Sequence, residues 1–133
     1  MTSRGADREI SALGISIYFV TKRIFIKDMV YRAVRLNTAL EERGHRVIEV
    51  YPHASKVRLF GRALPKKTTP AGRLFLSDEV GDIVGTEEVE SRKLTHDDYD
   101  AIIASYTGVL HHLGRTDTLG EPDEGATVLP AIS

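Results

Sequence analysis

The run VIEVY at residues 47–51 constrains the fold of this chain more than any other short stretch. Four of its five residues are β-branched or aromatic and Pro52 follows directly, as is typical of a short, largely buried strand. The residues before it form an amphipathic pattern that predicts a helix with Asp28 as N-cap and Gly44 just past its end. A helix followed at once by such a strand predicts an α/β fold.

A second long helix is predicted over residues 95–113, THDDYDAIIASYTGVLHHL. Thr95 followed three residues later by Asp98 matches a capping box, in which the hydroxyl and the carboxylate satisfy backbone donors of the first turn. Apolar residues then recur every three or four positions and predict a face that packs in the core. These residues are Tyr99, Ile102, Ile103, Tyr106, Leu110 and Leu113.

Two acidic residues in this helix are candidates for binding a metal ion. Asp97 and Asp100 are three residues apart and are therefore neighbours on the helix surface. Two adjacent carboxylates can hold a divalent cation, whereas Asp98 is expected to serve chiefly as a capping residue.

The other elements are predicted from shorter signals. Residues 1–10 suit a short surface helix or a frayed arm, and residues 15–25 a strand or a loop with apolar anchors. Short helices are expected at 53–61, with Val57, Leu59 and Phe60 inward, and at 74–84. Loops are expected at 64–73 and 114–125, a charged surface segment at 86–93, and a final strand at 126–130, at an edge of the sheet.

Composition limits the kind of protein. The 133 residues suit a single domain over 1–133. A formal net charge of −1 argues against a protein that coats nucleic acid, but it is compatible with a local basic groove. Without Cys there is no disulfide, thiolate zinc site or Cys nucleophile. No apolar run approaches the roughly 20 residues of a membrane span, and the charged start is unlike a signal peptide, so a cytoplasmic location is expected.

Glu49 is the anomaly of the predicted strand. Its carboxylate points either to solvent on an open face of the sheet or into a site where a cation or a hydrogen-bond donor compensates its burial, and the first alternative is favoured. The cations Lys56, Lys66, Lys67 and Arg73 likewise have two interpretations. They belong either to an ordinary solvated surface, which is favoured, or to a surface that meets phosphates.

Four segments taken in order carry a resemblance to a known family: RVIEVYPHA, LPKKTTPAGR, HDDYDAIIASYTGVLHHLG and GEPDEGATVLP. The combination resembles the family catalogued as domain of unknown function 429, described as predicted nucleases with a ribonuclease-H-like fold. The resemblance implies that fold, as a short mixed sheet with helices packed on it. The acidic helix is also similar to the last helix of Holliday-junction resolvases, whose paired acids bind metal.

The resemblance implies a set of functional residues. Glu49, Asp97 and Asp100 would be the catalytic and metal-binding acids for Mg²⁺ or Mn²⁺, and Lys56, Lys66, Lys67 and Arg73 would lie near nucleic-acid phosphates. Family members are longer and carry opening strands, one with a Gly-Ile-Asp sequence, that precede the part matched here. A truncated fold and a homo-oligomer that covers the exposed sheet edges are therefore expected.

Three functions follow as hypotheses. The first is a metal-dependent nuclease that acts on single-stranded nucleic acid, since no helix for reading base edges is visible. The second is a non-catalytic oligomeric or nucleic-acid-binding remnant of the ribonuclease-H-like fold. The third is a hydrolase of a phosphorylated small molecule, which would use the same acids but act on nucleotides and spare oligonucleotides.

Overall fold

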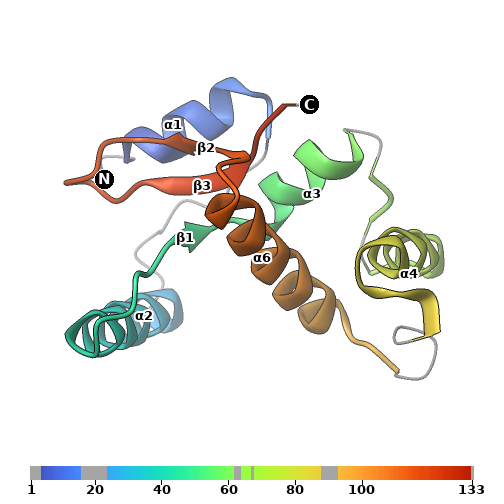
Figure 1. Ribbon diagram of the computed structural model, residues 1–133, viewed down its shortest axis with the longest axis horizontal. Helices are drawn as coiled ribbons and strands as arrows, with labels where there is room; N and C mark the ends of the chain where they lie inside the picture. The colour runs from blue at the N-terminus through green and yellow to red at the C-terminus, as the bar shows by residue number, and fades with distance from the viewer. Residues whose placement is uncertain (1–3, 16–23, 62–63, 67, 88–92, 133) are drawn as a thin grey trace. The chain divides into compact units, whose positions relative to one another are not determined.

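The computed structural model describes residues 4–15, 24–61, 64–66, 68–87 and 93–132, with side chains described from residue 28 onward in α2. The described chain has an α/β fold, in which the three strands form a small mixed sheet in the order β1-β3-β2 (Figure 1). The prediction of an α/β fold with a short mixed sheet is thus confirmed. The elements are α1 (Gly5–Ala12), α2 (Ile24–Glu42), β1 (Glu49–Val50), α3 (Pro52–Phe60), α4 (Pro70–Val84), α6 (His96–His112), β2 (Thr116–Leu119) and β3 (Thr127–Pro130).

The chain divides into two compact units whose boundaries fall within the strands. The N-terminal unit comprises Met1–Glu49 and Leu119–Thr127, and the helical unit comprises Val50–Thr118 and Val128–Ser133.

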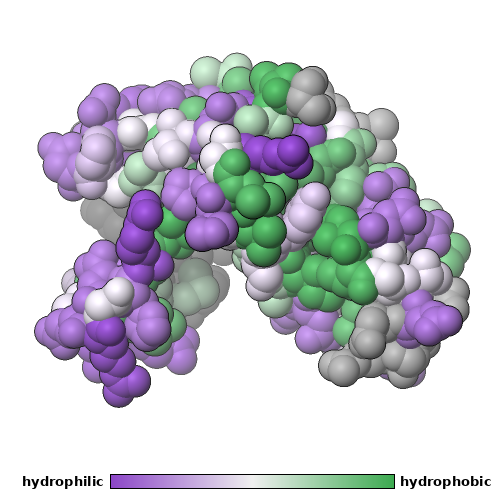
Figure 2. All heavy atoms as spheres, in the orientation of Figure 1, coloured by the Kyte–Doolittle hydropathy of each residue, from purple (hydrophilic) through white to green (hydrophobic). Residues whose placement is uncertain are grey.

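The helical unit is built around α6, against which α3 and α4 pack. Its core consists of Leu76 and Val80 from α4 and Tyr99 and Ile103 from α6. The rings of Phe60 and Phe75 meet edge to face beside this core. On the face seen in Figure 2, hydrophobic residues gather between α4 and α6. The predicted core face of α6 is confirmed for Tyr99, Ile103 and Leu110, whereas Leu113 is exposed because the helix ends before it.

In the N-terminal unit, α1 lies against the segment that precedes β3. Ala6 and Ile10 on α1 are buried, and Gly120 packs directly on Ala6. Of the predicted segment 1–10, residues 5–10 therefore form a helix and not a frayed arm, and residues 1–3 lie outside the described residues.

The start of α2 differs from the prediction. The helix begins at Ile24, so Asp28 lies inside it and is not the N-cap, and Ile24 and Phe25 do not belong to a strand. The remainder of the predicted strand lies mostly at 16–23, outside the described residues. The end is as predicted, with Gly44 at a positive φ of 82°. Met29, Val34 and Leu36, which belong to the apolar positions of the predicted amphipathic pattern, are exposed.

Three further predictions are corrected. Residues 70–73, expected in a loop, form the first turn of α4, because the Thr69 hydroxyl caps the helix by accepting from the Gly72 N–H and Pro70 suits the first helical position. Residues 116–119, also expected in a loop, form β2. The final strand is β3, and it lies in the middle of the sheet, where it pairs with both other strands, and not at an edge.

The short helix expected at 53–61 is α3, and Gly61 ends it with a φ of 86°. Its buried face differs from the prediction, because Ala54, Ser55 and Lys56 are buried while Val57 is only half-buried. Lys56, which was not among the residues expected to point inward, is thus buried.

Candidate functional site

The first turn of α6 has the cap that the sequence predicts. The Asp98 carboxylate accepts hydrogen bonds from the Thr95 N–H at 2.7 Å and from its hydroxyl at 2.8 Å, and Thr95 Oγ1 accepts from the Asp98 N–H at 3.3 Å. The bond from the Thr95 backbone, followed by that from its hydroxyl, lowers the pKa of Asp98 below its ordinary value. The predicted capping role of Asp98 is therefore confirmed.

This cap gives the fold a defined dependence on pH. Because the pKa of Asp98 is lower in the folded chain, its contribution to stability is complete above the unfolded pKa and is lost as the pH falls through the folded pKa. Asp98→Asn is expected to lower the urea midpoint at pH 6, with a difference from the parent that shrinks below about pH 4. Asp97→Asn is the matched control, and a difference that stays constant down to pH 3 would contradict the capping role.

Asp97 and Asp100 lie one turn apart on α6 and have different surroundings. The Asp97 side chain is 86% exposed, and its carboxylate lies 3.3 Å from Nε2 of His96. The Asp100 side chain is 25% exposed, and the Lys56 ammonium donates to its Oδ1 at 2.6 Å. One acid of the predicted pair therefore faces solvent, while the other is in an ion pair between α3 and α6.

Packing between α3 and α6 holds Lys56 in this position. Its side chain is only 6% exposed, and the neighbouring residue Ser55 is fully buried. The Thr107 hydroxyl lies 2.8 Å from the Ile103 carbonyl oxygen and 3.0 Å from Ser55 Oγ. The carbonyl can only accept, so Thr107 donates to it and accepts from Ser55. This buried chain of hydrogen bonds fixes α3 against α6 next to the ion pair.

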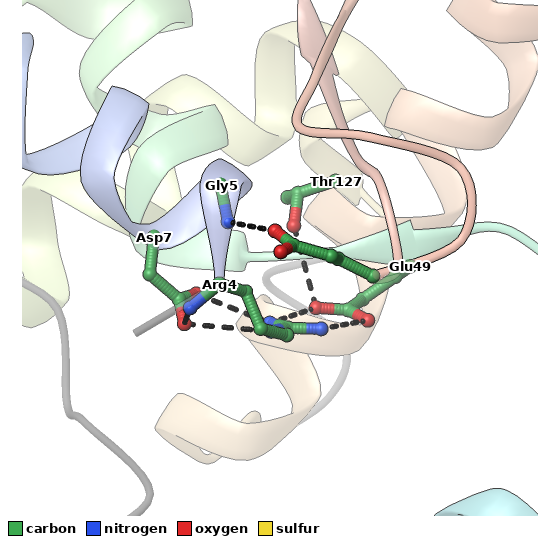
Figure 3. A network of polar contacts seen from close by, with 6 residues as sticks. Arg4, Gly5, Asp7, Glu49 and Thr127 are labelled. Atoms are coloured by element: carbon green, nitrogen blue, oxygen red, sulfur yellow. Dashed lines mark hydrogen bonds and ion pairs between the residues drawn. The ribbon is translucent and has the colours of Figure 1, made fainter. Parts of the chain in front are cut away.

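Glu49 lies in the N-terminal unit, in a polar network centred on Arg4 (Figure 3). Arg4 donates to the two carboxylate oxygens of Glu49 at 2.6 and 2.8 Å, and Thr127 Oγ1 donates to one of them at 3.3 Å. Arg4 also donates to Asp7. The Glu49 side chain is 46% exposed, as the favoured interpretation expects, but its carboxylate faces hydrogen-bond donors, as the alternative expects, so neither interpretation describes it fully.

The network pairs Arg4 with two carboxylates, and neighbouring hydrogen bonds attach α1 to the segment before β3. The side-chain hydrogen bond with Glu49 is the main cause that raises the pKa of Arg4, and Asp7 adds to it. At the start of α1 the Gly5 N–H donates to Glu124 at 2.7 Å, so a carboxylate satisfies a free donor of the first turn. The Gly120 N–H donates to Glu9 at 3.2 Å.

The predicted phosphate-binding cations differ in their exposure to solvent. Lys66 and Arg73 are exposed in the helical unit, the latter on α4. Lys56 is buried in its ion pair, and Lys67 lies outside the described residues. Of the predicted acids, Asp97 and Asp100 come together on one helix turn, whereas Glu49 belongs to the other unit.

Arg4, Asp7, Glu124 and the ion pair between Lys56 and Asp100 were not predicted from the sequence as parts of a site. The contact between Arg4 and Asp7 could have been predicted, because residues three apart in the sequence are neighbours in a helical turn. The contact of Glu124 with α1 and the pairing of Lys56 with Asp100 could not, since these contacts join residues far apart in the sequence. Within the described residues, no group of three or more His, Cys, Asp and Glu side chains is arranged to hold a metal ion.

Comparison with known protein families identifies a match. A family model described as protein of unknown function (DUF429) matches residues 4–125. No curated protein and no solved structure matches the chain. Among the helices that the structure describes, none is long and apolar enough to cross a membrane.

Proposed function

The chain belongs to the DUF429 family of proteins of unknown function, and from this premise we propose that it is a metal-dependent nuclease with a ribonuclease-H-like fold. Its proposed substrate is single-stranded nucleic acid, and its proposed cofactor is Mg²⁺ or Mn²⁺. The observation that carries the proposal is the arrangement of Asp97 and Asp100 on one turn of α6, with Lys56 2.6 Å from Asp100.

The donor set fits a hard cation. Mg²⁺ prefers oxygen ligands, keeps several waters, and is commonly held by one or two carboxylates together with phosphates of the substrate. Asp97 and Asp100 supply those two carboxylates. When bound, such an ion supplies Lewis-acid stabilisation of the charge that develops on a phosphodiester.

The residues of the chain have separate roles in this proposal. Asp97 and Asp100 bind the cation, and the exposed Lys66 and Arg73, together with Lys67, attract the phosphate backbone by charge. Glu49 is proposed to keep a structural role, because its two carboxylate oxygens accept from Arg4. A homo-oligomer is also proposed, supported by the exposed apolar side chains of α2.

Cleavage of labelled single-stranded DNA and RNA oligonucleotides in Mn²⁺ and in EDTA tests the proposal. We expect cleavage that needs the metal. The rate should fall at least about 100-fold in Asp97→Asn and in Asp100→Asn, because each substitution removes one of the two carboxylates that would hold the ion. Asp78→Asn, an exposed acid on α4, is the matched control. Undiminished cleavage in both site variants, or no cleavage by the parent protein, would overturn the assignment.

A second candidate is the non-catalytic nucleic-acid-binding remnant, which is favoured by the ion pairs of Asp100 with Lys56 and of Glu49 with Arg4. In these pairs the charges of Lys56 and Arg4 neutralise the carboxylates without a metal ion. This candidate predicts that oligonucleotides bind without being cleaved, and that Lys66→Gln and Arg73→Gln weaken the binding. Cleavage of nucleotides with oligonucleotides spared would instead indicate a phosphorylated small-molecule substrate.

A further inference from the structure

We infer that Lys56 is a built-in competitor for the cation at Asp100, so that the site binds a divalent ion weakly until a substrate phosphate adds its charge. The inference concerns how the proposed site is regulated and rests on the proposed function for the identity of that phosphate. It departs from the sequence-based assignment of Lys56 to nucleic-acid contact, because the ammonium is buried against Asp100.

Lys56 cannot easily leave this position. Its side chain is 6% exposed, and Nζ lies 2.6 Å from Asp100 Oδ1. The adjacent Ser55 is fixed to Thr107 of α6 by a buried hydrogen bond. Movement of the ammonium away from Asp100 would therefore require α3 to shift or a charge to enter the core, and both are costly.

The position of Lys56 sets the charge that a metal ion encounters. The ammonium balances the charge of Asp100 and leaves Asp97, which is 86% exposed, as the other carboxylate of the pair. The start of α6 adds the positive end of the helix dipole, which also opposes a cation. A phosphate group supplies the missing negative charge, so metal and substrate are expected to bind cooperatively.

Two effects of removing Lys56 oppose each other. A partner that orients a ligand typically contributes about 10- to 100-fold to metal affinity, so its loss would weaken binding. Repulsion between two like charges about 4 Å apart in a partly buried site would weaken the metal-binding equilibrium constant by roughly 1000-fold. The charge effect is the larger, and removal of the positive charge is expected to strengthen metal binding.

Calorimetric titration with Mn²⁺ alone tests this directly. In Lys56→Gln, which keeps an N–H donor while losing the charge, the dissociation constant for Mn²⁺ is expected to fall at least about tenfold. The gain should disappear in Lys56→Gln/Asp100→Asn. Arg115→Gln, an exposed cation of the same unit just beyond the end of α6, is the matched control and should not change it. Unchanged or weaker binding in Lys56→Gln would overturn the inference.

A measurement on the parent protein covers the case in which the variant fails to fold. Its Mn²⁺ affinity is expected to rise at least about tenfold when a single-stranded oligonucleotide with a cleavage-resistant backbone is present, and an unchanged affinity would also overturn the inference. The proposed function has a separate outcome. If Mn²⁺ affinity follows these expectations but no oligonucleotide is cleaved, the competitor role holds and the nuclease proposal fails. If cleavage occurs but neither affinity changes, only the competitor role fails.

Discussion

Replacing Ile103 with Ala is expected to lower the free energy of unfolding of the helical unit by about 2–5 kcal/mol. The Ile103 side chain is 0% exposed, and it belongs to the cluster in which α6 meets Leu76 and Val80 of α4. The substitution removes apolar atoms from a site that neighbouring side chains cannot refill, so a cavity adds to the lost transfer energy. Urea denaturation followed by circular dichroism measures the change.

Val109→Ala is the matched control, because Val109 lies on the same helix and is 54% exposed. It removes a similar apolar group without opening a cavity, and the change is expected to stay within about 0.5 kcal/mol. Equal losses in the two variants would show that α6 does not bury the face described here.

The success of the prediction for this helix has a physical reason. The Thr95 and Asp98 cap and the spacing of Tyr99 and Ile103 are all set within one helix, where the interacting groups are only a few residues apart. Local chemistry therefore determines the element, and a single sequence displays it. The family resemblance was visible for a related reason, because its four segments are continuous stretches of chain.

The predictions that failed depend on non-local or competing effects. Asp28 looks like an N-cap, but that preference is worth only about 1 kcal/mol, and residues 24–27 contain neither Gly nor Pro to stop the helix. Residues 116–119, TDTL, have a weak strand pattern and become β2 because they pair with β3. The sequence shows a strand's own preference but not the partner that stabilises it.

For the candidate site, too, the local features were predictable from the sequence and the long-range contacts were not. Adjacent placement of Asp97 and Asp100 follows from helix geometry, and the partial exposure of Glu49 follows from the rule that ionised carboxylates are rarely buried. The contacts of Lys56 with Asp100 and of Arg4 with Glu49 span 44 and 45 residues, so no local pattern reveals them. Tertiary packing decides which cation meets which acid.

Gly120→Ala is expected to destabilise the N-terminal unit by about 2–5 kcal/mol. Gly120 has a φ of 88°, and a Cβ placed on it would lie 2.6 Å from the backbone nitrogen of Ala6 and 2.7 Å from its Cβ. Neither group can move without α1 moving, because Ala6 is buried within that helix. We therefore expect α1 to detach, which hydrogen exchange of its amides measures as lost protection.

Gly44→Ala separates the two causes of this loss of stability, which are backbone strain at a positive φ and the steric clash with Ala6. Gly44 has a similar φ of 82° in the same unit, but no atom lies within 4 Å of the added Cβ, so only backbone strain of about 1–2 kcal/mol is expected. Protection of α1 should survive this control and fail in Gly120→Ala. Because Arg4 directly precedes α1, detachment should also release Glu49 from its ion pair. Equal protection of α1 in both variants would mean that close contact between Gly120 and Ala6 does not hold this helix in place.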